Sequence, residues 1–131
     1  RVIEIHGNED GVSCLQCRAR FERGEVFRWI QGGVAVPYCP RCQGILKPDS
    51  IAFDQPMPEG ASLDALDAVR DCDLLIIAGT SLEVQPIASL PLVALRAKTP
   101  LVVVNLQSTD YDPFASAVLR GRVGELLPKL L

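Results

Sequence analysis

Four cysteines in this sequence have a spacing that is typical of a metal site. Cys14 and Cys17 form one Cys-x-x-Cys pair, Cys39 and Cys42 form a second, and 21 residues separate the two pairs. Each pair presents two thiolates from one tight turn, and two such turns brought together give the closed tetrahedral site of structural Zn²⁺. Protein ligands then fill all four positions and leave no place for a catalytic water. Two disulfides or an iron–sulfur cluster would use the same residues, but the spacing favours zinc.

The residues around the cysteines are expected to form a small module that depends on this metal. Residues 10–48 predict a zinc ribbon with short strands, such as residues 26–30, and with little core of its own. Metal binding contributes about 10–16 kcal/mol to folding in comparable sites. Small or rigid residues allow the turns and the approach of the two arms: Gly32, Gly33, Pro37 and Gly44.

The rest of the chain alternates between helical and strand-like segments. Residues 73–79 and 100–105 are short apolar runs, and they predict parallel strands that are buried on both faces. Helices are predicted from a cap at Ser62 to about Asp71, over residues 86–98 with a kink or restart at Pro91, and over residues 121–131. A strand–helix–strand succession is a βαβ unit. The predicted fold class is therefore α/β: part of a Rossmann-like doubly wound parallel sheet, formed by residues 1–9 and 49–131, with the zinc module of residues 10–48 inserted.

Composition and charge exclude several classes of function. The chain has 131 residues, of which 48% are hydrophobic, and no segment approaches the roughly 20 apolar residues of a membrane span. Residues 10–48 carry six basic and three acidic side chains, too small an excess for a module that binds nucleic acid through phosphate contacts. Metal-type cysteines suit a reducing compartment, so we expect a cytoplasmic protein. The fifth cysteine, Cys72, is expected to be a small buried hydrophobic residue.

Polar residues follow both predicted strands. Gly79, Thr80 and Ser81 end the first strand, and Asn105 ends the second. Ligands of open α/β sheets bind beyond the carboxyl ends of the strands. Small hydroxyl side chains and an amide can hydrogen-bond phosphate or ribose, so a nucleotide site is one interpretation. Ordinary turns and helix caps are the other.

His6 is the single histidine in the sequence. It follows an alternating apolar stretch and precedes Gly7, which suggests a position at the end of a strand. A lone histidine is usually structural. With an ordinary pKa near neutrality, it is also suited to act as a general base.

The order of these motifs resembles the C-terminal part of a sirtuin, the family of NAD-dependent protein lysine deacylases. The resemblance runs from Ile3 to Leu131 and includes His6-Gly7, the four cysteines, residues 46–53, the Gly79-Thr80-Ser81 segment with residues 82–86, and Asn105. It implies NAD⁺ as co-substrate, structural Zn²⁺, and an acyl-lysine protein or peptide as the partner.

The resemblance also implies a role for individual residues. His6 matches the catalytic base, which takes a proton from a ribose hydroxyl after the acyl oxygen has displaced nicotinamide. The positions that match cofactor-binding residues are Gly79, Thr80, Ser81, Asn105, Leu106, Arg122 and Val123. The positions that match the two sides of the acyl-lysine peptide, which binds as an added strand, are Ile51, Ala52, Phe53, Glu83 and Val84.

Some positions depart from the family pattern. Ala52 replaces an aromatic residue, and Asp54-Gln55 stand where Gly-Glu is usual. A change from glycine to aspartate restricts the backbone and adds a charge beside the peptide. The glycine-rich turn that holds the pyrophosphate, and the segments that place the nicotinamide ribose, do not occur in these 131 residues. We therefore expect the chain alone to have little or no activity and to pair with a missing N-terminal half or a second copy. The alternative is a non-catalytic, zinc-stabilised module that binds an acyl-lysine peptide or a partner chain.

Overall fold

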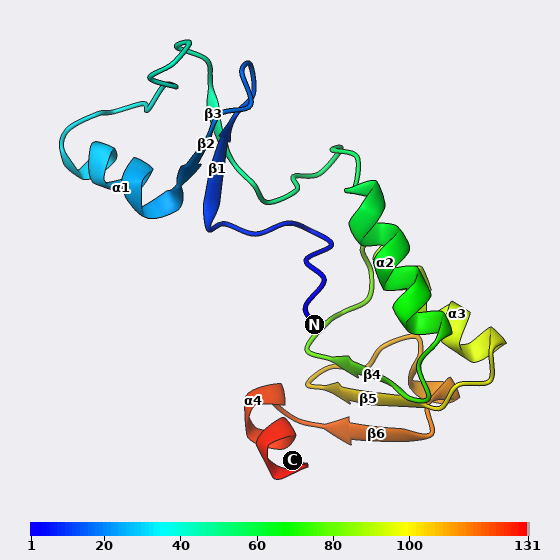
Figure 1. The fold of residues 1–131 in the computed structure, drawn as a ribbon. Helices are drawn as coiled ribbons and strands as arrows, with labels where there is room; N and C mark the ends of the chain where they lie inside the picture. Colours follow the sequence, from blue (N-terminus) through cyan, green and yellow to red (C-terminus); the bar gives the residue numbers. More distant parts are fainter. Residues whose placement is uncertain (131) are drawn as a thin grey trace. The chain divides into compact units, whose positions relative to one another are not determined.

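The computed structural model describes residues 1–130, and their contacts divide the chain into two compact units, Arg1–Ser62 and the part from Leu63 onward. Figure 1 traces the path of the chain through both. The predicted division into residues 10–48 and the remainder is a different partition, and it stays a prediction. None of the helices in the described part is long and apolar enough to cross a membrane.

The first unit contains a small antiparallel sheet and one helix. The strands are β1 (Gly11–Cys14), β2 (Arg20–Glu22) and β3 (Leu46–Pro48), in the order β2-β1-β3. Helix α1 (Arg23–Gln31) follows β2 directly, so the prediction of a strand at residues 26–30 is wrong. Branched and aromatic residues suggested a strand there. Their spacing also suits a helix, because Val26 and Ile30 are four residues apart, and Val26 is the buried residue of this helix.

The second unit contains a three-stranded parallel sheet. Its strands are β4 (Leu75–Ala78), β5 (Leu101–Asn105) and β6 (Ala117–Arg120), in the order β4-β5-β6. Strands β4 and β5 confirm the two predicted runs, and the mixed α/β fold class with a parallel sheet is confirmed. β6 was not predicted, since four residues bounded by polar ones give little signal. Figure 1 shows the three strands side by side.

Helix α2 (Glu59–Arg70) precedes β4, and the connection from β4 to β5 contains η1 (Ile87–Ser89) and α3 (Leu90–Arg96). Because α2 begins three residues before Ser62, the predicted cap is wrong. Pro91 lies in the first turn of α3, where its missing N–H costs nothing, so the predicted restart is confirmed.

Two more 3₁₀ turns, η2 (Asp112–Phe114) and η3 (Leu127–Lys129), and the short helix α4 (Val123–Leu126) complete the described elements. α4 is shorter than the predicted 121–131 helix, whose last residue, Leu131, lies outside the described residues.

A buried apolar cluster of the second unit lies on one face of the sheet, and Val104, which points to the other face, is also fully buried. Ile77, Leu101 and Val103 are buried together, against α3 and the loop after β5, and the paired residues Ile77 and Val103 share a face. Ile76 points to the other face and is 48% exposed. The prediction that residues 73–79 are buried on both faces is therefore wrong. β4 is an edge strand, and within the described residues one of its faces is open.

Candidate functional site

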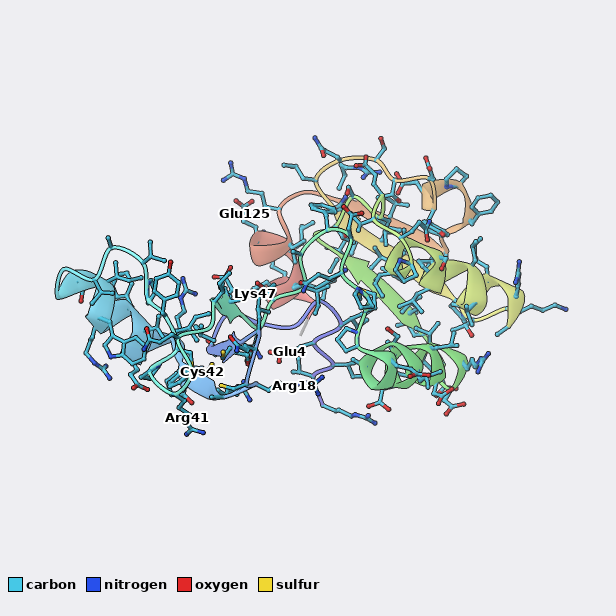
Figure 2. The ribbon with its side chains drawn as sticks, turned by 90° about the horizontal axis from the view of Figure 1, so that it is seen from above. Glu4, Arg18, Arg41, Cys42, Lys47 and Glu125 are labelled. Carbon is cyan, nitrogen blue, oxygen red and sulfur yellow. The ribbon has the colours of Figure 1, made fainter. Side chains whose placement is uncertain are left out.

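The four cysteines lie together at two matching turns. Cys14 ends β1, and the N–H of Arg18 donates to the Cys14 carbonyl at 3.0 Å; in the second turn the N–H of Gln43 donates to the Cys39 carbonyl at 2.8 Å. Arg18 and Gln43 each directly follow the second cysteine of a pair, with φ values of 59° and 61°. Each Cys-x-x-Cys turn therefore ends in a left-handed backbone conformation that a non-glycine residue adopts. Figure 2 labels Cys42 beside the sulfur atoms of this cluster.

The sulfur positions fit a tetrahedral metal. All four Sγ atoms lie within 4.8 Å of one another, with 3.5 Å between those of Cys14 and Cys42 and 3.6 Å between those of Cys17 and Cys39. Zn–S bonds of about 2.3 Å in a tetrahedron place sulfurs about 3.8 Å apart. A disulfide would need S–S of about 2.05 Å, and all five cysteines are free thiols. The geometry agrees with the zinc prediction and contradicts two disulfides.

The crowding of these thiols opposes the ionisation of all four at once. The Cys17 N–H donates to Cys14 Sγ and, together with smaller effects, lowers the pKa of Cys14 to about 6. At Cys42 the N–H of Gly44 lowers the pKa, but the neighbouring sulfurs, first that of Cys17, outweigh it and raise the pKa to about 12. Gly44 also permits this packing, since a Cβ there would lie 2.9 Å from Cys14 Sγ. A divalent cation bound by four thiolates removes the repulsion between them.

A second candidate site is a cleft of about 450 Å³ in the second unit, at the carboxyl ends of β4 and β5 and the start of α4. Eight residues line it: Gly79, Thr80, Ser81, Asn105, Leu106, Gln107, Arg122 and Val123. Seven of them are the residues that the sequence predicted for cofactor binding, and the structure brings all seven together. The sheet explains this, because parallel pairing of β4, β5 and β6 places all three strand ends at one edge.

Gly79 and Asn105 shape the floor of this cleft. Gly79 has φ +63°, and a Cβ there would lie 3.2 Å from Val123 Cγ2, so the turn after β4 requires glycine. Asn105 is only 6% exposed, and its side-chain N–H groups donate to the carbonyls of Thr80 at 2.9 Å and Gln107 at 3.1 Å. The Thr80 hydroxyl accepts from the Leu82 N–H at 3.2 Å. The amide of Asn105 therefore joins the loops after β4 and β5.

His6 lies in the first unit with an exposed side chain. Its carbonyl accepts from the Ile51 N–H at 2.7 Å, which places it beside the predicted substrate segment. Gly7 has φ +65°, and a Cβ there would collide with the Asp49 carbonyl. Residues 1–6 form no strand in the described structure, so the predicted strand end at His6 is wrong. Their backbone makes local turns instead, such as Gly7 N–H to the Glu4 carbonyl at 3.0 Å.

The two predicted substrate segments belong to different units, and both are accessible. Phe53 is 86% exposed, and a tight turn follows it: the Gln55 N–H donates to the Ala52 carbonyl at 3.2 Å, while Gln55 Oε1 accepts from the Ala52 N–H at 2.8 Å. Asp54 adopts φ 65° in this turn. Aspartate thus keeps a conformation that glycine adopts without strain. In the other unit Glu83 and Val84 are exposed.

Comparison with known proteins identifies the family. The Sir2 family model matches residues 1–86. The chain belongs to the Sir2 family. A relative from Pyrobaculum aerophilum, "NAD-dependent protein deacetylase 1", is 39% identical over 99% of the chain and 50% of its own length. "NAD-dependent protein deacylase 2" of Archaeoglobus fulgidus is 33% identical over 100% of the chain and 52% of its own length.

Solved Sir2-family structures have the same fold. "Structure of Sir2Tm bound to a propionylated peptide" and "Sir2-p53 peptide-NAD+" each superpose with a TM-score of 0.94 at 31% identity, and each covers 99% of the chain and 54% of the solved one. The chain therefore spans about half the length of the relatives that it matches.

Two residues at or beside the cleft were not predicted from the sequence. Gln107 lines it, and its carbonyl accepts hydrogen bonds from Asn105 and from Arg120 Nη1. Arg120 pairs with Asn105 across the β5–β6 ladder. Without β6, nothing in the sequence indicated that residue 120 lies beside residue 105.

Proposed function

We propose that this chain is part of an NAD-dependent protein lysine deacylase and contributes its zinc-binding module, its general base and the adenosine side of its NAD⁺ site. The observation that carries the proposal is the cleft at the strand ends, because it gathers all seven residues that match NAD-contacting positions of the family. The names of the relatives support the same activity.

In the proposed reaction an acyl-lysine, NAD⁺ and one water give lysine, nicotinamide and O-acyl-ADP-ribose. The amide bond of the acyl-lysine and the nicotinamide–ribose bond break, and the acyl group forms an ester with a ribose hydroxyl. His6 accepts the proton of a ribose hydroxyl, and its exposure leaves it accessible for that task.

The proposed NAD⁺ contacts are those that the family resemblance implies for the residues of the cleft. Gly79 permits close approach of the ligand, and Asn105 hydrogen-bonds the adenine ribose. Arg122 and Val123, at the start of α4, pack on the adenine. Four thiolates hold Zn²⁺ as a structural ion, because all of its tetrahedral positions are filled by the protein.

The proposed substrate is an acyl-lysine segment that binds as an added strand between Ile51, Ala52 and Phe53 on one side and Glu83 and Val84 on the other. The exposure of both segments supports this, as does the propionylated peptide named with one structural neighbour. The proposed compartment is the cytoplasm, where a reducing environment keeps the four cysteines available for metal.

The chain alone is expected to be inactive, because it contains no motif for the pyrophosphate and the nicotinamide ribose. The test mixes this chain with a separately produced first half of the Pyrobaculum aerophilum relative, an acetyl-lysine peptide and NAD⁺, and detects O-acetyl-ADP-ribose by mass spectrometry. We expect product from the mixture, none from either part alone, and none after His6→Ala.

The outcomes separate the candidate functions. Product from the chain alone would overturn its expected dependence on a second half. If no product forms, calorimetry measures whether the chain binds an acetyl-lysine peptide and whether it binds ADP-ribose. Peptide binding without nucleotide binding would instead support the non-catalytic module, and binding of neither would indicate that the chain alone is an inert fragment.

A further inference from the structure

The side chain of Asn105 is fixed so that only its oxygen remains for a ligand. Its two N–H groups donate to the carbonyls of Thr80 and Gln107. Because carbonyl oxygens only accept, the atom between them must be the amide nitrogen, which settles the orientation of the side chain. Within residues 1–130 no hydrogen bond reaches Asn105 Oδ1, and this residue lines the cleft. The site therefore offers an acceptor, and a hydroxyl group is the complementary donor.

Arg120 holds one of the two carbonyls that fix Asn105. Its Nη1 donates to the Gln107 carbonyl, and its Nη2 pairs with the Asp112 carboxylate. Arg120 and Asn105 are partners in the β5–β6 ladder, so the guanidinium reaches Gln107 from the neighbouring strand. It joins the loop after β5 to β6 at the edge of the cleft.

Asp112 is itself held in place. The Thr109 hydroxyl donates to Asp112 Oδ1 at 2.8 Å, and the neighbouring Tyr111 hydroxyl donates to the Ala88 carbonyl at 2.6 Å. The side chain of Asp112 is 17% exposed, against 41% for Arg120. The loop that carries Gln107 is thus anchored at several points, and Arg120 is the link between that anchor and the carbonyl that orients Asn105.

We propose that Arg120 is a positioning residue of the nucleotide site: by holding the Gln107 carbonyl, it keeps Asn105 Oδ1 available to accept a hydrogen bond from a ribose hydroxyl of the ligand. This inference rests on the proposed nucleotide-binding function. The inference goes beyond that function, because it assigns the discrimination between ribose and deoxyribose to Arg120, a residue outside the cleft lining. Without Arg120, Asn105 loses a fixed acceptor for one N–H, and its amide rotates so that nitrogen and oxygen both face the ligand.

The first test needs no ligand. In ¹⁵N-labelled, zinc-loaded chain, the Asn105 side-chain amide is assigned by its loss in Asn105→Ser, and its hydrogen exchange is measured. We expect slow exchange in the wild type, fast exchange in Arg120→Met, and an intermediate rate in Arg120→Lys, since one ammonium group reaches Gln107 or Asp112 but does not match the guanidinium fork. Arg70→Met is the matched control, because it removes an exposed Arg–Asp pair outside the cleft lining.

The second test uses ADP and its 2′-deoxy and 3′-deoxy analogues as probes, with binding followed by NMR titration. We expect the wild type and Arg70→Met to bind ADP roughly tenfold more tightly than one analogue, the value of one hydrogen bond. In Arg120→Met this ratio falls toward one, and Arg120→Lys restores part of it. A purely structural role for Arg120 would weaken all three probes equally and leave the ratio unchanged.

The outcomes separate the inference from the function on which it rests. Wild-type chain that binds no probe would count against the proposed nucleotide site, and the exchange rate of Asn105 would still decide whether Arg120 positions it. Folded Arg120→Met with unchanged Asn105 exchange, or with an unchanged ribose-to-deoxyribose ratio, would overturn the inference while the nucleotide site stands.

Discussion

The two units of this chain are stabilised in different ways. In the first unit the buried cluster consists of Cys14, Ala19 and Cys39, so two of its three members are predicted metal ligands. In the second unit the cluster consists of the apolar residues Ile77, Leu101 and Val103, packed between a sheet and its connections. The first unit is organised around the four-cysteine cluster, and the second around an apolar core.

The surface of the first unit also indicates that this unit has little apolar core. Several large apolar side chains of the first unit remain exposed, among them Phe27, Val36 and Ile45 at 55%, 59% and 62%. A sheet of strands only three or four residues long covers little apolar area, and a unit of about 60 residues is marginal without a staple. Metal removal should therefore affect the two units very differently, although they are similar in length.

The largest expected effect comes from loss of the metal. Chelation of zinc, or Cys39→Ser, removes a contribution of about 10–16 kcal/mol and unfolds the first unit. Trp29 is the single tryptophan and packs edge-on against Phe21 with ring centroids 5.7 Å apart, so its fluorescence reports on this unit alone. We expect its emission to shift to that of a solvated indole, while the β5 amides of the second unit stay protected from hydrogen exchange.

Cys72→Ser is the matched control for the metal experiment. Cys72 belongs to the second unit, and its thiol donates to the Val69 carbonyl at 3.2 Å, a bond that serine can replace. We expect one zinc per chain and unchanged Trp29 emission. If β5 lost its protection on chelation, the two units would not be independently stabilised, and the comparison would fail.

The next largest effect should come from the apolar core of the sheet. Leu101 is 1% exposed, and Leu101→Ala should lower the free energy of unfolding of the second unit by about 2–5 kcal/mol, from lost burial and the cavity left behind. Ile76→Ala on β4 removes a side chain that is 48% exposed and should cost clearly less. Denaturant unfolding followed by β5 hydrogen exchange measures both. Equal losses would mean that the open face of β4 is covered in solution.

A smaller effect is expected at the turn that shapes the cleft. Gly79 has φ +63°, and an alanine there carries a backbone cost of about 1–2 kcal/mol together with a tight contact to Val123. Gly79→Ala should lower the stability of the second unit by that amount and weaken ADP binding. Gly124→Ala, in α4 with no atom within 4 Å of its Cβ position, should instead stabilise the unit by about 0.5–1 kcal/mol. Calorimetric melting of both variants tests the contrast.

The sequence predicted the features that short local patterns encode. Two Cys-x-x-Cys turns, the apolar runs of β4 and β5, and the polar residues after them are each visible within a few residues. The strand ends then predicted Gly79, Thr80, Ser81 and Asn105 as cleft residues, because parallel pairing brings carboxyl ends to one edge. Leu106, Arg122 and Val123 were expected only from the family resemblance.

The features that were missed depend on distant partners. β6 is four residues long, and only its pairing with β5 makes it a strand. Helix α1 contains residues that favour strands, yet the burial of Val26 in a helix prevails over that propensity. The hydrogen bond from Arg120 to Gln107 joins residues 13 apart, and no local pattern indicates it.

The smallest expected effect concerns Asp112 and its dependence on pH. The Arg120 guanidinium, with the Thr109 hydroxyl, holds the pKa of Asp112 below its ordinary value. The group is more acidic in the folded state, so its stabilisation is present at pH values above its ordinary pKa of about 4 and is lost as pH falls through the lower folded value. We expect Asp112→Asn to lower the stability of the second unit slightly from pH 5 to 8, and the difference from wild type to vanish in stronger acid. Asp67→Asn, which removes the more exposed pair with Arg70, should show no such difference. Exchange of the β5 amides in both variants between pH 3 and 8 provides the measurement, and an Asp112→Asn difference that grows toward acid would contradict the assigned role of Arg120.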